Sequence, residues 1–356
     1  MGHQCCSGEH SHDEECACGH DHQEEGCACG HDHVHEHHHG GCGCGGEDHG
    51  HGHEGHSHVD PYAVVTATFT LGGVKWRVRR WGDPSGHPVV MLHGFMQSAA
   101  SWDFIAPEVA SQGRCVYALD LVGHGGSDAP SDPEAYSYEA LVDGVASFLE
   151  NVACVDPSTG ERRKAAVIGY SMGGRLALRL VQTRADLLRG VLLESCGFGP
   201  VDEAARQAAR ERNEGWAARL REEGMEAFVA YWEDLPLFAT QRERGLDERL
   251  RPERLANDAQ AMAHIVERAG KHVMPLEQET IDALSFTWVP IAYVCGEEDA
   301  TIGKLAHKLH ERGIEVHRAG TGHNVHLEAP MLYLGIVQDF LRSTELSGLG
   351  AILRTK

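Results

Sequence analysis

The chain has 356 residues and a formal net charge of −22, with 53 acidic and 31 basic side chains, 26 histidines and 12 cysteines. This acidic balance argues against nucleic acid or an anionic membrane surface as a partner. No apolar run is long enough to span a bilayer, and the first residues lack the basic start and apolar core of a signal peptide. We therefore expect a cytoplasmic protein without membrane insertion.

Composition divides the chain near residue 60. Residues 1–60 contain sixteen histidines, eight cysteines, thirteen acids and no lysine or arginine. Apolar residues are almost absent, so no core can offset the ordering entropy, and we expect a disordered tail in the absence of a ligand. The tail is interpreted as a chelating appendage to a catalytic domain, and its effect on that domain is left open.

The tail contains a repeat with metal-ligand character. A Cys-Ala-Cys-Gly-His-Asp-His heptapeptide begins at Cys16 and recurs eleven residues later at Cys27. Cys-x-Cys and His-x-His place thiolate and imidazole donors close enough to hold one ion, and these donors suit zinc, nickel, copper or cobalt. The predicted ligands are Cys16, Cys18, His20, His22, Cys27, Cys29, His31 and His33.

Residues 61–346 read as one globular domain, followed by a short C-terminal extension at 347–356. Strands are predicted by alternating or continuous apolar runs at 62–71, 74–81, 88–92, 115–119, 165–168, 190–194, 290–295 and 315–318. Helical patterns are predicted at 98–111, 138–152, 175–180, 304–312 and 330–342. This alternation predicts the α/β class, with a mainly parallel twisted sheet and helices on both faces.

A long helical block interrupts this alternation. From about residue 200 to 272 the strand signals stop, and the sequence is rich in Ala, Arg and Glu, with breaks at Gly224, Pro236 and Gly245. The block stands between two late strands. We therefore predict an inserted helical lid over the carboxyl edge of the sheet.

The most informative stretch is Gly169-Tyr170-Ser171-Met172-Gly173, which follows an apolar strand and opens a helix. A serine on so sharp a strand-to-helix turn is held in a strained conformation with its hydroxyl exposed, and the glycines leave room for the neighbouring backbone. The helix also points its positive end at whatever lies over Ser171. This context predicts a nucleophile elbow.

Two more residues complete an acid–base set with Ser171. Asp299 and His323 each follow a predicted strand, at the edge of a parallel sheet where ligands bind. The order Ser, Asp, His along the chain is the one expected of an α/β-hydrolase. His323 can accept the proton of Ser171, and Asp299 can fix the tautomer of the imidazole. The backbone N–H groups of Phe95 and Met172 would form the oxyanion hole.

Some alternatives remain open from the sequence. Spacing does not choose among adjacent carboxylates, so Glu297 or Glu298 could replace Asp299 as the orienting acid. His326 competes with His323, whereas His93 is interpreted as a brace within its loop. Ser171 could also be a buried helix cap.

Four motifs together carry a resemblance to a known family. They are His93-Gly94-Phe95, Asp120-Leu121-x-Gly123-His124-Gly125-x-Ser127, Gly169-Tyr170-Ser171-Met172-Gly173-Gly174-Arg175, and Gly322-His323-Asn324-x-His326-x-Glu328-x-Pro330. Between roughly residues 64 and 341, the chain resembles the 2-succinyl-6-hydroxy-2,4-cyclohexadiene-1-carboxylate synthases of menaquinone biosynthesis. The chain departs from that pattern at Val122, where the loop more often has proline, and at Ala300-Thr301-Ile302.

The resemblance implies an α/β-hydrolase fold and a lyase activity. Such a lyase eliminates pyruvate from a small polycarboxylate, 2-succinyl-5-enolpyruvyl-6-hydroxy-3-cyclohexene-1-carboxylate, with a Ser-His-Asp triad as general base and no cofactor for catalysis. It implies carboxylate clamps at Arg175 and Arg210, and substrate contacts from Trp232 and Tyr170. Arg175 lies one helical turn past Ser171, on the same face. The alternatives without a role in substrate binding are that Arg175 and Arg210 face solvent and that Trp232 belongs to the lid core.

The sequence keeps three functions open. The first is the lyase just described. The second is a serine hydrolase of the same fold, that is an esterase, a thioesterase or a C–C hydrolase. The third is a metal-storage or metal-delivery protein that carries a degenerate catalytic domain.

Overall fold

The computed structural model describes residues 59–353, in which eight strands form a single sheet. Along the sheet the order is β1-β2-β4-β3-β5-β6-β7-β8; β1 and β2 run antiparallel to their neighbours, and the other six strands are parallel. The strands are β1 (Val65–Leu71), β2 (Val74–Trp81), β3 (His87–Leu92), β4 (Arg114–Leu119), β5 (Ala165–Tyr170), β6 (Leu188–Glu194), β7 (Ile291–Gly296) and β8 (Glu315–Ala319).

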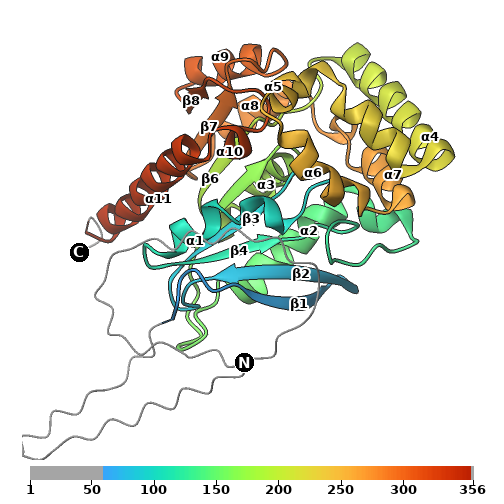
Figure 1. Cartoon of the computed structure of the whole chain (residues 1–356). Helices are drawn as coiled ribbons and strands as arrows, with labels where there is room; N and C mark the ends of the chain where they lie inside the picture. Colours follow the sequence, from blue (N-terminus) through green and yellow to red (C-terminus); the bar gives the residue numbers. More distant parts are fainter. Residues whose placement is uncertain (1–58, 354–356) are drawn as a thin grey trace, which may run out of the picture. The chain divides into compact units, whose positions relative to one another are not determined.

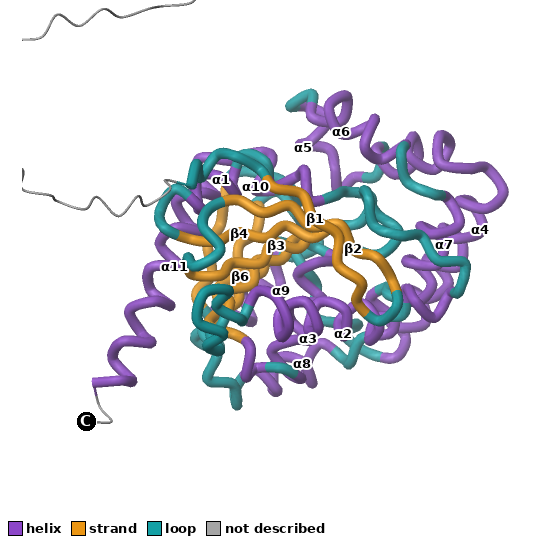
Figure 2. The backbone as a smooth tube through the Cα atoms, turned by 90° about the horizontal axis from the view of Figure 1, so that it is seen from below, coloured by secondary structure: helices purple, strands orange, loops and turns teal. Residues whose placement is uncertain are grey.

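Helices cover both faces of the sheet. They are α1 (Ile105–Ala110), α2 (Tyr138–Phe148), α3 (Met172–Thr183), α4 (Glu203–Glu233), α5 (Ala239–Glu243), α6 (Leu246–Leu255), α7 (Ala259–Arg268), α8 (Glu277–Leu284), α9 (Gly303–Glu311), α10 (Val325–Glu328) and α11 (Pro330–Leu353). Helices α2, α3, α8 and α9 lie together on one side of the strands (Figure 2), and α1 and α11 pack against the other side. The α/β-hydrolase architecture predicted from the alternation is confirmed.

Two hydrophobic cores follow from the period-two alternation of the buried strands. In β3, Val89 and Met91 belong to the core beneath α1 and α11, whereas Val90 and Leu92 belong to the core beneath α2 and α3. Every residue of β4 and of β5 is buried. Continuous apolar strands are therefore required here, because each face of the strand is covered by helices.

The helices predicted at 98–111, 138–152 and 330–342 have different limits in the structure. Residues 138–152 form α2 as far as Phe148 and then a π-helical turn (Leu149–Ala153). Residues 98–111 form a 3₁₀ helix (Ala99–Trp102) and then α1, not one continuous helix. The Ser98 hydroxyl caps the 3₁₀ helix, and Pro107 lacks the N–H that a continuous helix would need there, so it is tolerated only in the first turn of α1. The final helix α11 continues past Arg342 to Leu353.

The segment between β6 and β7 is helical, and its helices α4, α6 and α7 lie beside one another (Figure 1). The predicted breaks are found in it. Gly224 kinks α4 with φ of 78°, Pro236 opens a 3₁₀ helix, and Gly245 precedes α6 with φ of 66°. Positive φ favours glycine, because a Cβ would clash with the backbone. Within residues 59–353, no helix is both long and apolar enough to cross a membrane.

Candidate active site

Ser171 lies on a strained turn between β5 and α3. Its backbone has φ of 49° and ψ of −105°, and it is one of three non-glycine residues with positive φ in the described range. A Cβ on Gly169 would lie 2.6 Å from the Gly173 carbonyl oxygen, and one on Gly173 would lie 2.3 Å from that of Leu92. The glycines therefore let three backbone segments approach closely, which holds the serine in this conformation.

His323 stands between Ser171 and Asp299. Its Nε2 lies 3.2 Å from the Ser171 hydroxyl oxygen, and its Nδ1 lies 2.6 Å from Asp299 Oδ2. Asp299 follows β7 and His323 follows β8, so two adjacent parallel strands deliver the acid and the base to the same sheet edge. The Ser171 side chain makes no helix-capping hydrogen bond, which excludes the capping interpretation.

The surroundings of Asp299 keep it ionised. Burial alone would raise the pKa of this carboxyl, which is only 3% exposed, but hydrogen bonds and the charge of His323 outweigh burial and lower the pKa below its ordinary value of 3.8. Thr301 contributes two of these hydrogen bonds, from its amide at 3.0 Å and its hydroxyl at 2.5 Å, both to Oδ1. An ionised Asp299 orients His323 and favours the imidazolium.

The structure separates Asp299 from its sequence neighbours. Glu297 and Glu298 are exposed, whereas Asp299 points inward and contacts His323. The other two histidines considered in the sequence, His326 and His93, make structural hydrogen bonds. His326 Nδ1 binds the buried Glu194 carboxylate at 2.9 Å, and the His93 ring spans the Leu121 amide and the Gly94 carbonyl.

The two predicted backbone donors are available. Within residues 59–353, the amides of Phe95 and Met172 have no hydrogen-bond acceptor, whereas the neighbouring Gly173 amide is bound to the His93 carbonyl at 3.1 Å. Met172 is the first residue of α3, where helix geometry leaves the N–H free. Strands β3 and β5 are adjacent, with Leu92 opposite Gly169, so the two loops that carry these amides start side by side.

A cavity of about 540 Å³ opens over Ser171 and His323. Its wall combines the loops after the parallel strands with the inserted helices. Tyr170 and Trp232 both line it. Trp232 also packs against Phe95, Trp216, Phe228 and Phe238, so the cavity contact and the lid-core contact coexist in one side chain.

The side chains that line this cavity give it a positive charge. Four cationic side chains line it and no carboxylate does; the cations are Arg175, Arg212, Arg254 and Lys271. The first is only partly exposed, and one of its guanidinium nitrogens donates to the Ala269 carbonyl at 3.0 Å. Within residues 59–346, Arg175, Arg212 and Lys271 form no ion pair. Arg175 and Lys271 are only partly exposed, and leaving such cations unpaired is costly, so the charge of this cavity suits an anionic ligand.

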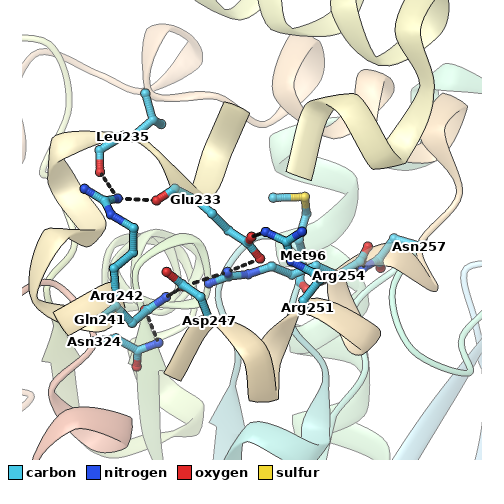
Figure 3. A network of polar contacts seen from close by, with 10 residues as sticks. All are labelled: Met96, Glu233, Leu235, Gln241, Arg242, Asp247, Arg251, Arg254, Asn257 and Asn324. Carbon is cyan, nitrogen blue, oxygen red and sulfur yellow. Dashed lines mark hydrogen bonds and ion pairs between the residues drawn. The ribbon is translucent and has the colours of Figure 1, made fainter. Parts of the chain in front are cut away.

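Arg254 differs from the other three cations because its charge is already compensated. It is 3% exposed and lies 2.8 Å from the Glu233 carboxylate and 3.1 Å from that of Asp247. Figure 3 shows the hydrogen bonds that extend from these ion pairs. Gln241 donates to the Asp247 carboxylate and accepts from the side chain of Asn324, the residue next to His323. The network ties the inserted helices to the histidine loop.

Arg210 does not line the cavity, contrary to the expectation for this residue. It is exposed and borders a separate surface pocket with Glu214 and Arg268. Two residues later, Arg212 lines the cavity and lies over the Trp216 ring at 5.1 Å. Each helical residue turns the side chain by about 100°, so positions two apart point to opposite sides.

The sequence analysis missed three of the four cavity cations, Arg212, Arg254 and Lys271. A signal existed for Arg212, because it lies one helical turn before Trp216, on the same face. The predicted metal ligands Cys16 to His33 lie outside the described residues. Within residues 59–346, no group of three or more His, Cys, Asp or Glu side chains could hold a metal ion.

A profile described as "Alpha/beta hydrolase family" matches residues 89–334. With the eight-stranded sheet, this match identifies the chain as an alpha/beta hydrolase. A Klebsiella pneumoniae 2-succinyl-6-hydroxy-2,4-cyclohexadiene-1-carboxylate synthase is 30% identical over 267 residues, which cover 74% of this chain and 96% of that protein. A Bacillus subtilis protein, given the same name provisionally, is 33% identical over 277 residues, covering 76% and 96%. The chain belongs to this synthase family.

Solved structures agree with this assignment. The structure of MenH from S. aureus superposes with a TM-score of 0.67 at 25% identity, covering 75% of this chain and 98% of that one. The enol-lactonase from Burkholderia xenovorans LB400 has a TM-score of 0.64 at 20% identity, covering 78% and 100%. The second similarity concerns the fold alone, because the same fold carries many reactions.

Proposed function

We propose that this protein is a carbon–oxygen lyase that forms 2-succinyl-6-hydroxy-2,4-cyclohexadiene-1-carboxylate by eliminating pyruvate from 2-succinyl-5-enolpyruvyl-6-hydroxy-3-cyclohexene-1-carboxylate. The observation that supports this most strongly is the charge of the cavity: unpaired cations and no carboxylate line the cavity that opens over Ser171. The substrate carries three carboxylates, on the ring, the succinyl chain and the enolpyruvyl group. The named relatives at 30% and 33% identity add support.

In this proposal Ser171 acts as a base and forms no covalent bond with the substrate. His323 accepts the hydroxyl proton while the serine oxygen removes a proton from the ring. The electron pair of that C–H bond enters the ring π system, and the C–O bond to the enolpyruvyl group breaks. The leaving enolate takes up the proton that His323 accepted, which gives pyruvate and restores the neutral imidazole. Asp299 favours the imidazolium form of His323 during this transfer.

The remaining residues bind and stabilise. The free amides of Phe95 and Met172 would donate to the oxygen that gains negative charge as the ring proton leaves. The Arg175 guanidinium would hold a ring-borne carboxylate in bidentate geometry one turn away from Ser171. Tyr170 and Trp232 would contact the ring from the cavity wall.

Measuring pyruvate release tests the proposal. Wild-type protein incubated with the enolpyruvyl cyclohexene substrate should release one pyruvate per product ring, and the Arg179→Met protein, altered outside the cavity, should match it. The competing function is ester hydrolysis, because a strained serine with two free amides also suits acyl transfer. Hydrolysis of p-nitrophenyl esters with an acyl adduct on Ser171, and no pyruvate release, would establish the hydrolase instead.

We also propose that residues 1–60 bind a transition metal through the repeated cysteines and histidines, independently of catalysis. The support is the spacing of soft donors in two copies of one heptapeptide. Titration of full-length protein with zinc should give tight stoichiometric binding that is lost when the tail is removed. Equal binding by the shortened protein would contradict the proposal.

A further inference from the structure

Lys271 is a cation in the cavity that neither the triad nor the proposed arginine clamp uses. It begins a 3₁₀ helix (Lys271–Val273) after α7, and its side chain is partly buried and lines the cavity. Within residues 59–346 its ammonium makes no hydrogen bond or ion pair. The carboxylate whose charge acts on Lys271 is that of Glu277, but Glu277 accepts a hydrogen bond from the Lys308 ammonium at 2.6 Å. The ammonium is therefore free to bind a ligand.

The backbone around Lys271 is fixed from several directions. Arg175 donates to the Ala269 carbonyl at 3.0 Å, and Arg206 donates to the carbonyls of His272 and Met274 at 2.7 Å each. Gly270 is required, because a Cβ there would lie 2.0 Å from Asn213 Nδ2. Arg175 thus binds the backbone segment that carries the second cation, two residues before Lys271.

The ammonium lies over the loop that follows β6. A Cβ on Gly197 would lie 3.5 Å from Lys271 Nζ. Ser195, two residues earlier, also lines the cavity; it is 1% exposed, and its hydroxyl has no hydrogen-bond partner in the described part of the chain. A buried hydroxyl without a partner is destabilising, so a ligand that accepts from it is favoured. The ammonium and the free hydroxyl line the same cavity, and each suits a carboxylate ligand.

Electrostatics favours a ligand with more than one carboxylate. Burial is the main cause that lowers the pKa of Lys271, and the charges of Arg175 and Arg212 lower it further. One carboxylate held by Arg175 would leave Lys271 uncompensated. The cations therefore match a ligand that places two carboxylates in the same cavity.

We propose that Lys271 binds the terminal carboxylate of the succinyl chain, while Arg175 binds the carboxylate on the ring. This assignment rests on the proposed function. A lysine ammonium on a flexible stem suits a carboxylate at the end of a flexible chain, whereas the planar arginine fork suits the one fixed to the ring. Lys271 is then a specificity-determining residue that selects substrates with a chain carboxylate.

The test compares two stable aromatic probes by calorimetry. 2-(3-Carboxypropanoyl)benzoate has both carboxylates, and 2-butanoylbenzoate lacks the one on the chain. Wild type should bind the diacid at least about tenfold more tightly than the monoacid, because a charge-assisted bond is lost in the monoacid. Lys271→Met should reduce this ratio to about twofold or less, and Lys271→Arg should restore part of it. The exposed Lys304→Met is the charge-matched control and should retain the wild-type ratio.

A second pair of variants leaves Lys271 in place. Gly197→Asp would put a carboxylate beside the ammonium, and Gly197→Asn would put a neutral group of the same shape there. Only the aspartate should abolish the preference for the diacid. An undiminished preference in Lys271→Met, or no preference in wild type, overturns the assignment. These binding results decide the role of Lys271 even if the protein releases no pyruvate, in which case the proposed function fails separately.

Discussion

Arg175→Met gives the sharpest test of the carboxylate clamp. Methionine has nearly the length of arginine but no charge, so the substitution removes the guanidinium from the cavity and its hydrogen bond to the Ala269 carbonyl at 3.0 Å. Truncating one partner of a buried, hydrogen-bonded charge pair costs about 2 to 5 kcal/mol. Taking about 3 to 4 kcal/mol, we expect kcat/KM for pyruvate release to fall roughly 150- to 900-fold.

Fold stability should change much less than activity in Arg175→Met. One hydrogen bond is lost, about 1 kcal/mol, but an unpaired and partly buried charge is removed as well. The control is Arg179→Met, one turn further along α3, where the arginine pairs with the exposed Glu139. This control should keep kcat/KM within about twofold, since surface pairs contribute little. An unchanged kcat/KM in Arg175→Met, or a matching loss in the control, would refute the clamp.

Three further predictions concern pH and the tail. Thr301→Val removes the hydroxyl hydrogen bond to the Asp299 carboxylate. The lowered pKa of Asp299 means that this ionised carboxylate stabilises the fold above pH 3.8, and that the stabilisation is lost as the pH falls through the folded pKa. The Tm deficit of the variant relative to wild type should therefore be largest near neutral pH and should shrink below pH 3.8, and a deficit that does not change with pH would contradict this. Burial and the charges of Arg175 and Arg212 lower the pKa of Lys271 below 10.5, although Glu277 opposes the shift. The ammonium should therefore lose its proton below pH 10.5, and the KM for substrate should rise there in wild type. Lys271→Arg should show no such rise, because arginine stays charged. Deleting residues 1–59 should leave kcat/KM within about twofold, whereas a large loss would show that the tail takes part in catalysis.

The strands and the elbow were predictable because local rules and the fold agree. The apolar runs of β4 and β5 match full burial on both faces, and Gly169 and Gly173 are required by close backbone contacts that their spacing already indicates. The single helix predicted at 98–111 was wrong, since the pattern of apolar residues alone gives no weight to Pro107.

The choice among adjacent candidates was not predictable. Three consecutive acids follow β7, and only the folding back of that loop decides that Asp299 contacts His323 while Glu297 and Glu298 face solvent. Spacing along a loop carries no information about direction, because turn geometry can point any of the three inward.

The sequence also could not predict which cations of the inserted segment line the cavity. Helix α4 contacts α6, α7 and the 3₁₀ helix that begins at Lys271, and its sequence does not fix which of its residues line the cavity. Arg210 was therefore predicted where Arg212 is found. Lys271 belongs to no motif; its position depends on Gly270 and Arg175, which are far apart in the sequence. Cavity residues of this kind are identified only from the three-dimensional structure, which brings segments distant in the sequence together.

Pyruvate release by wild type and by Ser171→Ala, measured side by side with the enolpyruvyl cyclohexene substrate, tests the central claim most directly. If Ser171 is the base that His323 activates, wild type releases pyruvate and the variant loses at least about 1,000-fold in kcat while remaining folded. A variant that releases pyruvate at the wild-type rate would contradict the account.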